Sequence, residues 1–170
     1  INISSRELTQ PDFFRRFLAA MDANKTPATM IEIELTESLA MRLEGAVLDN
    51  LCDLRRRGVT IAIDDFGTGF SNLARLKDLP VDRIKIDRSL VRDILISNEA
   101  RTICSAVVGL IQGLGMQVVI EGVESEEQVE MLRIIGCTVF QGFHLSRPVE
   151  EGRYMQRFGN NAEPQIDVAG

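Results

Sequence analysis

Residues 59–67 read VTIAIDDFG, an apolar run that ends directly in two acidic residues. A run this rich in β-branched residues is typical of a strand that is buried on both faces in a parallel sheet. Asp64 and Asp65 cannot continue that core, because burying an unpaired charge has a high free-energy cost. The stretch therefore predicts a buried strand whose carboxyl end carries acids with a function.

Other apolar runs along the chain end in the same way, near Ile3, Leu35, Ile86, Ile120 and Phe140. Polar residues lie at or close to their ends: Asn2, Glu34, Glu37, Lys85, Asp87, Glu121, Glu124 and Gln141. Parallel strands present their carboxyl ends at one rim of a sheet or barrel. We therefore expect these side chains to converge on one site.

Segments with helical period separate the strands, and helices are expected at about 11–21, 43–57, 103–114 and 125–135. Pro11 suits the first turn of the first helix. Gly58 is placed to stop the second helix, and Ser125 begins a capping box that opens the last one. Strands and helices in alternation predict parallel strands joined by crossover helices.

Two architectures fit this alternation, an open doubly wound sheet and a closed barrel. The first strand is not followed by a glycine-rich nucleotide loop, and functional groups at many strand ends favour the barrel. A complete barrel of this kind needs about 250 residues, and this chain has 170. We therefore predict an α/β fold, a TIM-barrel-like (β/α)8 variant that lacks its first one or two strand–helix units. The domain is expected over residues 1–158, with a flexible tail at 159–170, and because the chain starts at Ile1 we expect a segment upstream.

The bulk composition is that of a globular domain, with 45% hydrophobic and 26% charged residues. The net charge of -6 argues against binding of a nucleic acid polymer. There is no apolar window long enough to span a membrane and no signal peptide. Three widely spaced cysteines, Cys52, Cys104 and Cys137, predict reduced thiols rather than disulfides or a zinc site.

The strand-end residues supply hard oxygen ligands, from the carboxylates of Glu34, Asp64, Asp65 and Glu121 and the amide of Asn2. Such a set, without histidine or cysteine, favours Mg²⁺ or Mn²⁺. One member of the adjacent Asp64–Asp65 pair could bridge two cations, which is the usual arrangement for phosphodiester hydrolysis. Lys85 would orient water or phosphate among these acids.

Each of these residues also has a structural interpretation. A lone Glu34 could be a surface residue, Lys85 could only neutralise Asp64 and Asp65, and Glu37 and Glu124 could cap helices. His144 is expected to be a packing or surface residue, and Tyr154 a structural one. The functional interpretation rests on the whole set, which is more specific than any member.

Several motifs together resemble the EAL family of cyclic di-GMP phosphodiesterases over residues 1 to about 150. In order they are Asn2-Ile3-Ser4, Glu34-Leu35-Thr36-Glu37, DDFGTGFS at 64–71, Lys85-Ile86-Asp87, Glu121-Gly122-Val123-Glu124 and Gln141-Gly142-Phe143. The resemblance implies a variant of the eightfold barrel. It also implies opening of cyclic di-GMP to linear pGpG with Mg²⁺ or Mn²⁺.

The resemblance assigns roles to the residues of these motifs. The implied metal ligands are Asn2, Glu34, Asp64, Asp65 and Glu121. Lys85 is similar to the residue that holds or activates the attacking water, and Gln141 to a group that binds water or supports the ligands. Asp87 and Glu124 lie beside them and are expected to help shape the site.

The resemblance also implies partners. The segment from Phe66 to Leu73 resembles a loop that couples dimerisation to metal binding, and Glu37 resembles the residue that anchors it. A homodimer is therefore expected, with sensor or GGDEF domains upstream. The domain should face the cytoplasm, even if its parent is anchored in the inner membrane.

The Glu-Ala-Leu signature that names the family does not occur in these 170 residues. Its glutamate is a metal ligand, so we expect the intact domain to be active and this chain alone to be inactive. The main alternative is a catalytically inactive relative that acts as a cyclic di-GMP receptor or a scaffold. An aldolase is a weaker alternative, because Lys85 among carboxylates would stay protonated and be a poor nucleophile.

Overall fold

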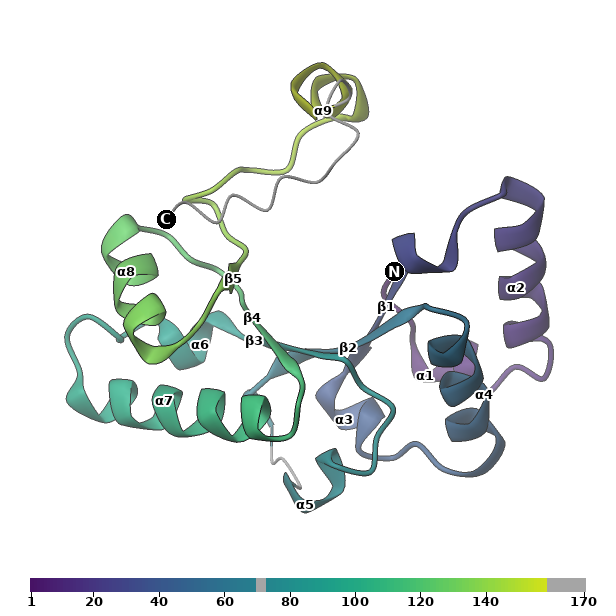
Figure 1. Ribbon diagram of the computed structural model, residues 1–170, viewed down its shortest axis with the longest axis horizontal. Helices are drawn as coiled ribbons and strands as arrows, with labels where there is room; N and C mark the ends of the chain where they lie inside the picture. The colour runs from purple at the N-terminus through teal and green to yellow at the C-terminus, as the bar shows by residue number, and fades with distance from the viewer. Residues whose placement is uncertain (70–72, 159–170) are drawn as a thin grey trace.

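Five parallel strands form the sheet of the described chain, which covers residues 1–69 and 73–158 of a computed structural model (Figure 1). They are β1 (Glu32–Thr36), β2 (Thr60–Phe66), β3 (Arg83–Ile86), β4 (Gln117–Ile120) and β5 (Val139–Phe140). Their order across the sheet is their order along the chain. The predicted tail at 159–170 lies outside the described residues.

The N-terminal residues extend the sheet beyond β1. Asn2 forms a parallel bridge with Glu34, the amide of Ile3 donates to the carbonyl of Glu34 at 3.0 Å, and the amide of Glu34 donates to the carbonyl of Ile1 at 2.9 Å. The predicted strand ending near Ile3 is therefore present as a short segment beside β1. In a doubly wound sheet the order of the strands reverses at one point, and no such reversal occurs among the described strands. This contradicts the open-sheet alternative and fits consecutive strands of a (β/α)8 barrel.

Helices connect the strands and flank the sheet. They are α1 (Ser5–Leu8), α2 (Phe13–Asn24), the 3₁₀ turn η1 (Ala28–Met30), α3 (Glu37–Ala40), α4 (Gly45–Arg56), α5 (Leu73–Leu76), α6 (Arg88–Val91), α7 (Asn98–Gly113), α8 (Glu126–Ile135) and α9 (Glu151–Phe158). In Figure 1, α2 and α4 lie toward one end of the sheet and α6, α7 and α8 toward the other, while α9 lies apart from it.

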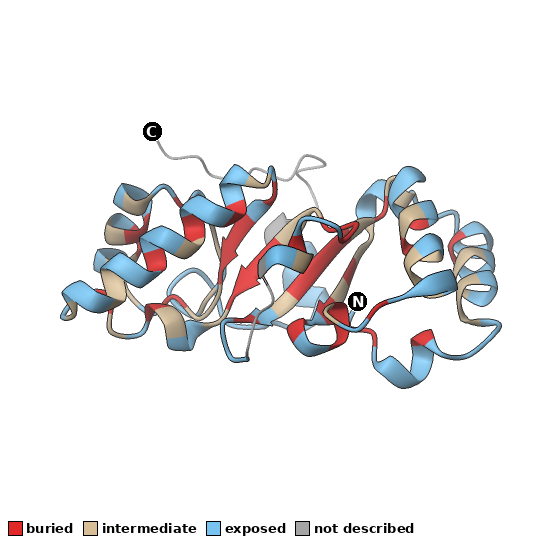
Figure 2. Cartoon of the chain, turned by 90° about the horizontal axis from the view of Figure 1, so that it is seen from below, coloured by how far each residue is buried: buried red, intermediate tan, exposed pale blue. Residues whose placement is uncertain are grey.

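One face of the sheet packs against the helices and forms the hydrophobic core. Its strand residues are Ile33, Leu35, Ile61, Ile63, Ile84, Ile86, Val118 and Ile120, each at most 3% exposed. Leu51 and Leu54 of α4 and Val108 and Ile111 of α7 complete it. Figure 2 shows these buried positions on the strands and on the helix sides that face them.

The opposite face of the sheet is polar, which the sequence predicted only at the strand ends. Alternate residues of a strand share a face, so Glu32 lies with Glu34 on β1 and Arg83 lies with Lys85 on β3. Ala62 is buried between these strands but is not part of the hydrophobic core cluster. In a barrel this second face points to the interior, and the charged residues therefore line the barrel lumen.

Local capping explains where the helices begin and end. Helix α2 begins at Phe13 with Asp12 as its N-cap, so Pro11 precedes the helix and the predicted place in its first turn is wrong. The hydroxyl of Ser125 accepts from the amide of Gln128 at 3.3 Å, but Gln128 Oε1 accepts from the amide of Glu124 at 2.8 Å. In a regular capping box the side chain of Gln128 would accept from the amide of Ser125. Here it accepts from the amide one residue earlier, that of Glu124.

The substitution Gly109→Ala is expected to stabilise the fold. Gly109 lies on the exposed side of α7, and a Cβ there would have no heavy atom within 4 Å. Alanine has the higher helix propensity, so the free energy of unfolding should rise by about 0.5 to 1 kcal/mol. Urea denaturation measures this change, and a loss of stability would contradict the helix geometry described here.

Candidate metal centre at the strand ends

A bulge at the end of β2 turns two adjacent acids toward the same rim. Ile63 pairs with Ile84 and Phe66 pairs with Ile86, so β2 contains one residue more than β3 over this stretch. Asp65 has a φ of 54°, in the left-handed region that aspartate tolerates better than most residues. The bulge offsets the strict alternation of side chains and lets Asp64 and Asp65 approach one site.

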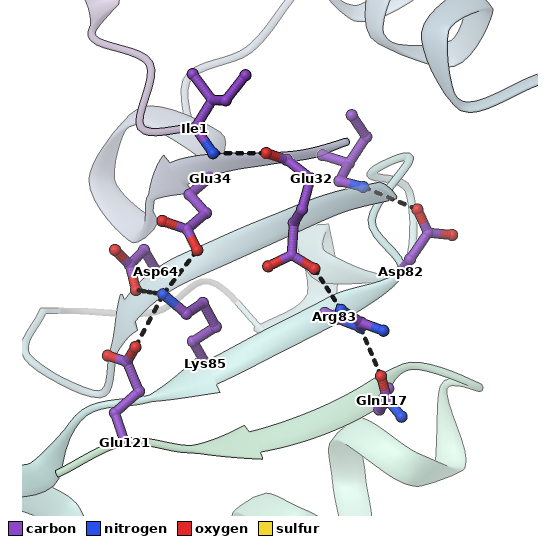
Figure 3. A network of polar contacts seen from close by, with 10 residues as sticks. Ile1, Glu32, Glu34, Asp64, Asp82, Arg83, Lys85, Gln117 and Glu121 are labelled. Carbon is purple, nitrogen blue, oxygen red and sulfur yellow. Dashed lines mark hydrogen bonds and ion pairs between the residues drawn. The ribbon is translucent and has the colours of Figure 1, made fainter. Parts of the chain in front are cut away.

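Lys85 lies among three carboxylates contributed by three other strands or strand ends (Figure 3). Its Nζ is 2.9 Å from Glu34 Oε1, 3.0 Å from Asp64 Oδ1 and 2.8 Å from Glu121 Oε1. The residue is only 5% exposed. This confirms that the charges predicted at the ends of β1 to β4 converge.

Burial opposes the charged form of Lys85, but the hydrogen bonds that its ammonium donates to Glu121, Glu34 and Asp64 outweigh burial and raise the pKa of the amine above its ordinary value of 10.5. The ammonium is therefore the form present at neutral pH. It can donate hydrogen bonds and orient an oxygen atom, but it cannot remove a proton.

Two of the acids have raised pKa values. Burial is the main cause for Glu121, where the nearby Lys85 works in the opposite direction. Burial and then the negative charges of Asp64 and Asp87 raise the pKa of Asp65. Both shifts arise mainly from burial, and the neighbouring carboxylates add to it.

Oxygen atoms of Asp64, Asp65 and Glu121 all lie within 4.8 Å of one another. Asp64 Oδ1 is buried, and the Lys85 ammonium lies 3.0 Å from it. Three carboxylates with oxygen atoms this close together are suited to a hard cation. Glu34 is not a member of this group, although its Oε1 lies 2.9 Å from Lys85 Nζ, and the backbone of Asn2 pairs with it.

The segment after β2 is tied to β1 by Glu37. This residue begins α3, is 5% exposed, and its Oε2 accepts from the amide of Gly67 at 3.0 Å. A Cβ on Gly69 would lie 3.5 Å from Glu37 Oε1, so the segment passes close to the carboxylate. The contact agrees with the predicted anchor, while residues 70–72 of the predicted loop lie outside the described part.

A cavity of about 680 Å³ adjoins the acids at the ends of β3, β4 and β5. Its lining includes Asp87, Arg88, Glu121, Glu124, Gln141, Phe143, Arg147 and Tyr154. Asp87 is also the N-cap of α6, where its Oδ1 accepts from the amide of Ser89 at 2.9 Å. Hydrogen bonding to the side chain of Ser89, and then to its backbone, lowers the pKa of Asp87. The cavity therefore brings Asp87, Glu124 and Gln141 near Glu121. In the described part of the chain, none of these three side chains forms a hydrogen bond or an ion pair with Lys85.

Residues 1–148 match the EAL domain family. The chain belongs to the EAL domain family. PA2567, a cyclic di-GMP phosphodiesterase of Pseudomonas aeruginosa, is 36% identical over 149 residues, covering 88% of this chain and 25% of that protein. MucR of the same organism, a bifunctional diguanylate cyclase/cyclic di-GMP phosphodiesterase, is 38% identical over 149 residues, covering 88% of this chain and 22% of that protein.

Solved structures of EAL enzymes share the fold. The PaMucR phosphodiesterase in complex with c-di-GMP matches with a TM-score of 0.82 and 38% identity over 89% of this chain and 62% of that one. The Klebsiella pneumoniae BlrP1 manganese/c-di-GMP complex matches with a TM-score of 0.76 and 36% identity over 84% of this chain and 37% of that one. The chain spans only 20% to 25% of the first curated relatives. The predicted barrel variant is confirmed.

In this EAL domain several cavity residues escaped the sequence analysis. Tyr154 of α9, expected to be a structural residue, is 54% exposed and lines the cavity. The guanidinium of Arg147 lies 4.9 Å from the ring centre of Phe143. The sequence signal for this part of the cavity was the aromatic Phe143 and the basic Arg147, which follow the Gln141-Gly142 motif. Both lie after the last strand, and the sequence analysis considered only residues at strand ends.

The remaining predictions concern residues away from the EAL centre. His144, expected to be a packing or surface residue, has its Nε2 2.8 Å from Glu126 Oε2 at the start of α8. The three cysteines are free thiols, and burial raises the pKa of Cys104 to about 11 and that of Cys137 to about 12. Among the described residues, no helix combines the length and apolarity needed to cross a membrane.

Proposed function

We propose that this chain forms the catalytic centre of a phosphodiesterase that hydrolyses cyclic di-GMP to linear pGpG. The observation that carries the proposal is the convergence of Glu34, Asp64 and Glu121 on Lys85 at the strand ends of an EAL domain. The names of relatives such as PA2567, and the c-di-GMP complexes of related structures, support the substrate.

The residues of the centre fit Mg²⁺ or Mn²⁺, because they offer only hard oxygen atoms and those of Asp64, Asp65 and Glu121 lie within 4.8 Å of one another. Asn2, Glu34, Asp64, Asp65 and Glu121 would hold the ions. When bound, a pair of such cations would lower the pKa of a water molecule and offset charge on the phosphate. The manganese complex of BlrP1 supports this choice of metals.

Lys85 would hold the attacking water by donating a hydrogen bond to its oxygen. Because its pKa is raised, the ammonium cannot take the proton of that water, which must leave by another route. The water oxygen adds to one phosphorus, one ester bond to a ribose oxygen breaks, and that oxygen gains a proton. Gln141, which lines the cavity together with Glu121, would bind water there.

The cavity beside the acids would bind the dinucleotide. Phe143 offers an aromatic face for a guanine base, and Arg88 and Arg147 offer positive charge for phosphate oxygens. Asp87 and Glu124 would shape the wall between the cavity and the acids. A cavity of about 680 Å³ lies within the range of small-molecule sites.

The expected partners follow from the same proposal. Glu37 holds Gly67 at the start of the segment Phe66 to Leu73, which would couple a homodimer interface to Asp65. The bifunctional relative MucR supports a GGDEF or sensor domain upstream. A second messenger as substrate places the site in the cytoplasm, whether or not the parent protein is anchored in a membrane.

Hydrolysis is tested with the full-length protein that contains this chain. Incubation with cyclic di-GMP and Mg²⁺, followed by chromatography, should give pGpG, and Glu34→Ala should lower the rate about 100-fold. The matched control is Glu130→Ala, which removes an exposed acid of α8 and should leave the rate unchanged. The chain of residues 1–170 alone should form no product, because it lacks the Glu-Ala-Leu glutamate.

Two results would contradict the proposal. Turnover without a metal ion would contradict the role of the carboxylates as metal ligands. Saturable binding of cyclic di-GMP without product would instead place the protein among receptors, the alternative function for this fold.

The Mn²⁺ affinity of the full-length protein is expected to fall as the pH is lowered, beginning above the ordinary carboxyl pKa of 4.5. Metal ions bind ionised carboxylates, and the raised pKa values of Glu121 and Asp65 let protons compete at a higher pH. Titration of free Mn²⁺ by electron paramagnetic resonance measures the effect. Glu121→Gln should bind more weakly but with a shallower pH dependence, and a wild-type affinity that is constant down to pH 4.5 would contradict the prediction.

A further inference from the structure

A second set of polar contacts lies on the lumen face, nearer the amino ends of the strands than the Lys85 cluster (Figure 3). Arg83 Nη1 is 2.6 Å from Glu32 Oε2, and Arg83 Nε donates to Gln117 Oε1 at 2.5 Å. We call Glu32, Arg83 and Gln117 the lower tier. No motif in the sequence pointed to it.

The lower tier joins the same strands as the Lys85 cluster. Glu32 and Glu34 are both on β1, and Arg83 and Lys85 are both on β3, each pair separated by one residue. On the third side, Gln117 begins β4 and Glu121 directly follows it. Each cation of β3 therefore reaches across β2 to an acid of β1 and also binds a residue of the β4 segment.

Strand β2 leaves room for both crossings. Ala62 pairs in register with Glu34 on one side and with Arg83 on the other. It is fully buried, yet it lies outside the hydrophobic core cluster. A small residue at this place lets the long side chains of β1 and β3 meet above it.

We propose that the lower tier is a positioning element that fixes the separation of Glu34 and Glu121 and reserves Lys85 for them. This inference rests on the proposed function, since it concerns the geometry of the proposed metal centre. Arginine suits the task, because its planar fork can donate in two directions at once, here to β1 and to β4.

The lower tier also removes a competing acceptor. Glu32 lies on the same face as Glu34 and would otherwise offer a second carboxylate to the flexible Lys85 side chain. Pairing with Arg83 occupies it. The pair is 40% and 25% exposed at Arg83 and Glu32, so its contribution to stability is modest. Its main effect is therefore expected on the geometry of the metal ligands rather than on folding.

The test is a Mn²⁺ titration of the full-length protein, followed by electron paramagnetic resonance, with Arg83→Met and Arg83→Lys. Arg83→Met should raise the dissociation constant about tenfold, as loss of a partner behind metal ligands does. Arg83→Lys keeps the charge but loses the fork, and should give an intermediate increase. Gln117→Leu removes one arm only and provides a milder variant should Arg83→Met fail to fold.

Arg55→Met is the matched control. Arg55 Nε lies 2.7 Å from Asp82 Oδ1, in an ion pair of similar exposure. Neither residue is among the ion-pair partners of Lys85 in the described chain. It should change urea stability as much as Arg83→Met does, but leave the Mn²⁺ affinity within about twofold. Wild-type affinity in Arg83→Met, or equal weakening in Arg55→Met, would overturn the positioning role. A wild-type protein that binds no Mn²⁺ would instead overturn the proposed metal centre itself.

Discussion

Lys85→Met is expected to lower cyclic di-GMP hydrolysis by the full-length protein about a thousandfold, within the range for loss of a group that handles the reacting water. Methionine fills a similar volume but offers no proton to an oxygen. Glu34, Asp64 and Glu121 would also lose the cation that they share. Rates with saturating substrate and Mg²⁺ measure the loss.

The same substitution should lower the free energy of unfolding in the absence of metal by about 3 kcal/mol, because removal of one partner leaves buried charges uncompensated. The pKa of Lys85 is raised in the folded state, so its stabilising contribution is present in full below 10.5 and is lost as the pH rises through the folded value. At neutral pH the whole difference should therefore be visible. In the variant, acidification that protonates the carboxylates should recover stability.

Lys77→Met is the control, since Lys77 is exposed at the end of α5. It should leave both the rate and the stability unchanged. A Lys85→Met variant with near wild-type turnover would contradict the role of the ammonium, even if its stability fell as expected.

Gly142→Ala is expected to destabilise the domain by about 3 kcal/mol through overpacking. A Cβ on Gly142 would lie 2.2 Å from the carbonyl oxygen and 2.3 Å from the amide nitrogen of Val123. Neither atom can move freely, because the amide of Val123 donates to Gln141 and its carbonyl accepts from His144. The strand-end segment must therefore separate from the turn after β4.

Urea denaturation of Gly142→Ala, with Gly109→Ala as the control, tests this close approach. Both substitutions add one methyl group, but only the first meets backbone atoms. Binding of cyclic di-GMP should weaken as well, because the segment that moves carries Gln141 and Phe143 into the cavity. Equal stabilities of the two variants would contradict the packing at Gly142.

The sequence was sufficient for the sheet and for the acids at its rim. Apolar runs that end in polar residues located β1 to β5, and the parallel arrangement then predicted that Glu34, Asp64, Lys85 and Glu121 would meet. The sequence did not reveal the bulge at Asp65, since a one-residue offset between strands leaves no mark on hydrophobic periodicity.

Other features depended on tertiary context. Glu32 and Arg83 begin their strands, where a charge looks like an exposed residue unless the lumen of the barrel is known to be polar. The cavity wall at Tyr154 depends on how the chain turns after β5. Either Pro11 or Asp12 could have stood at the start of α2. The hydrophobic pattern does not distinguish a helix that includes Pro11 in its first turn from one that has Asp12 as its N-cap.

The left-handed backbone at Asp65 has a consequence for experimental design. Only glycine, asparagine and aspartate adopt such a conformation readily, so the position constrains shape and charge separately. Asparagine keeps the shape and removes the charge, glycine keeps the shape and removes the side chain, and alanine disturbs both. Comparison of Asp65→Asn with Asp65→Ala thus separates what the carboxylate contributes from what the chain path contributes, a distinction that an alanine scan alone would merge into one number.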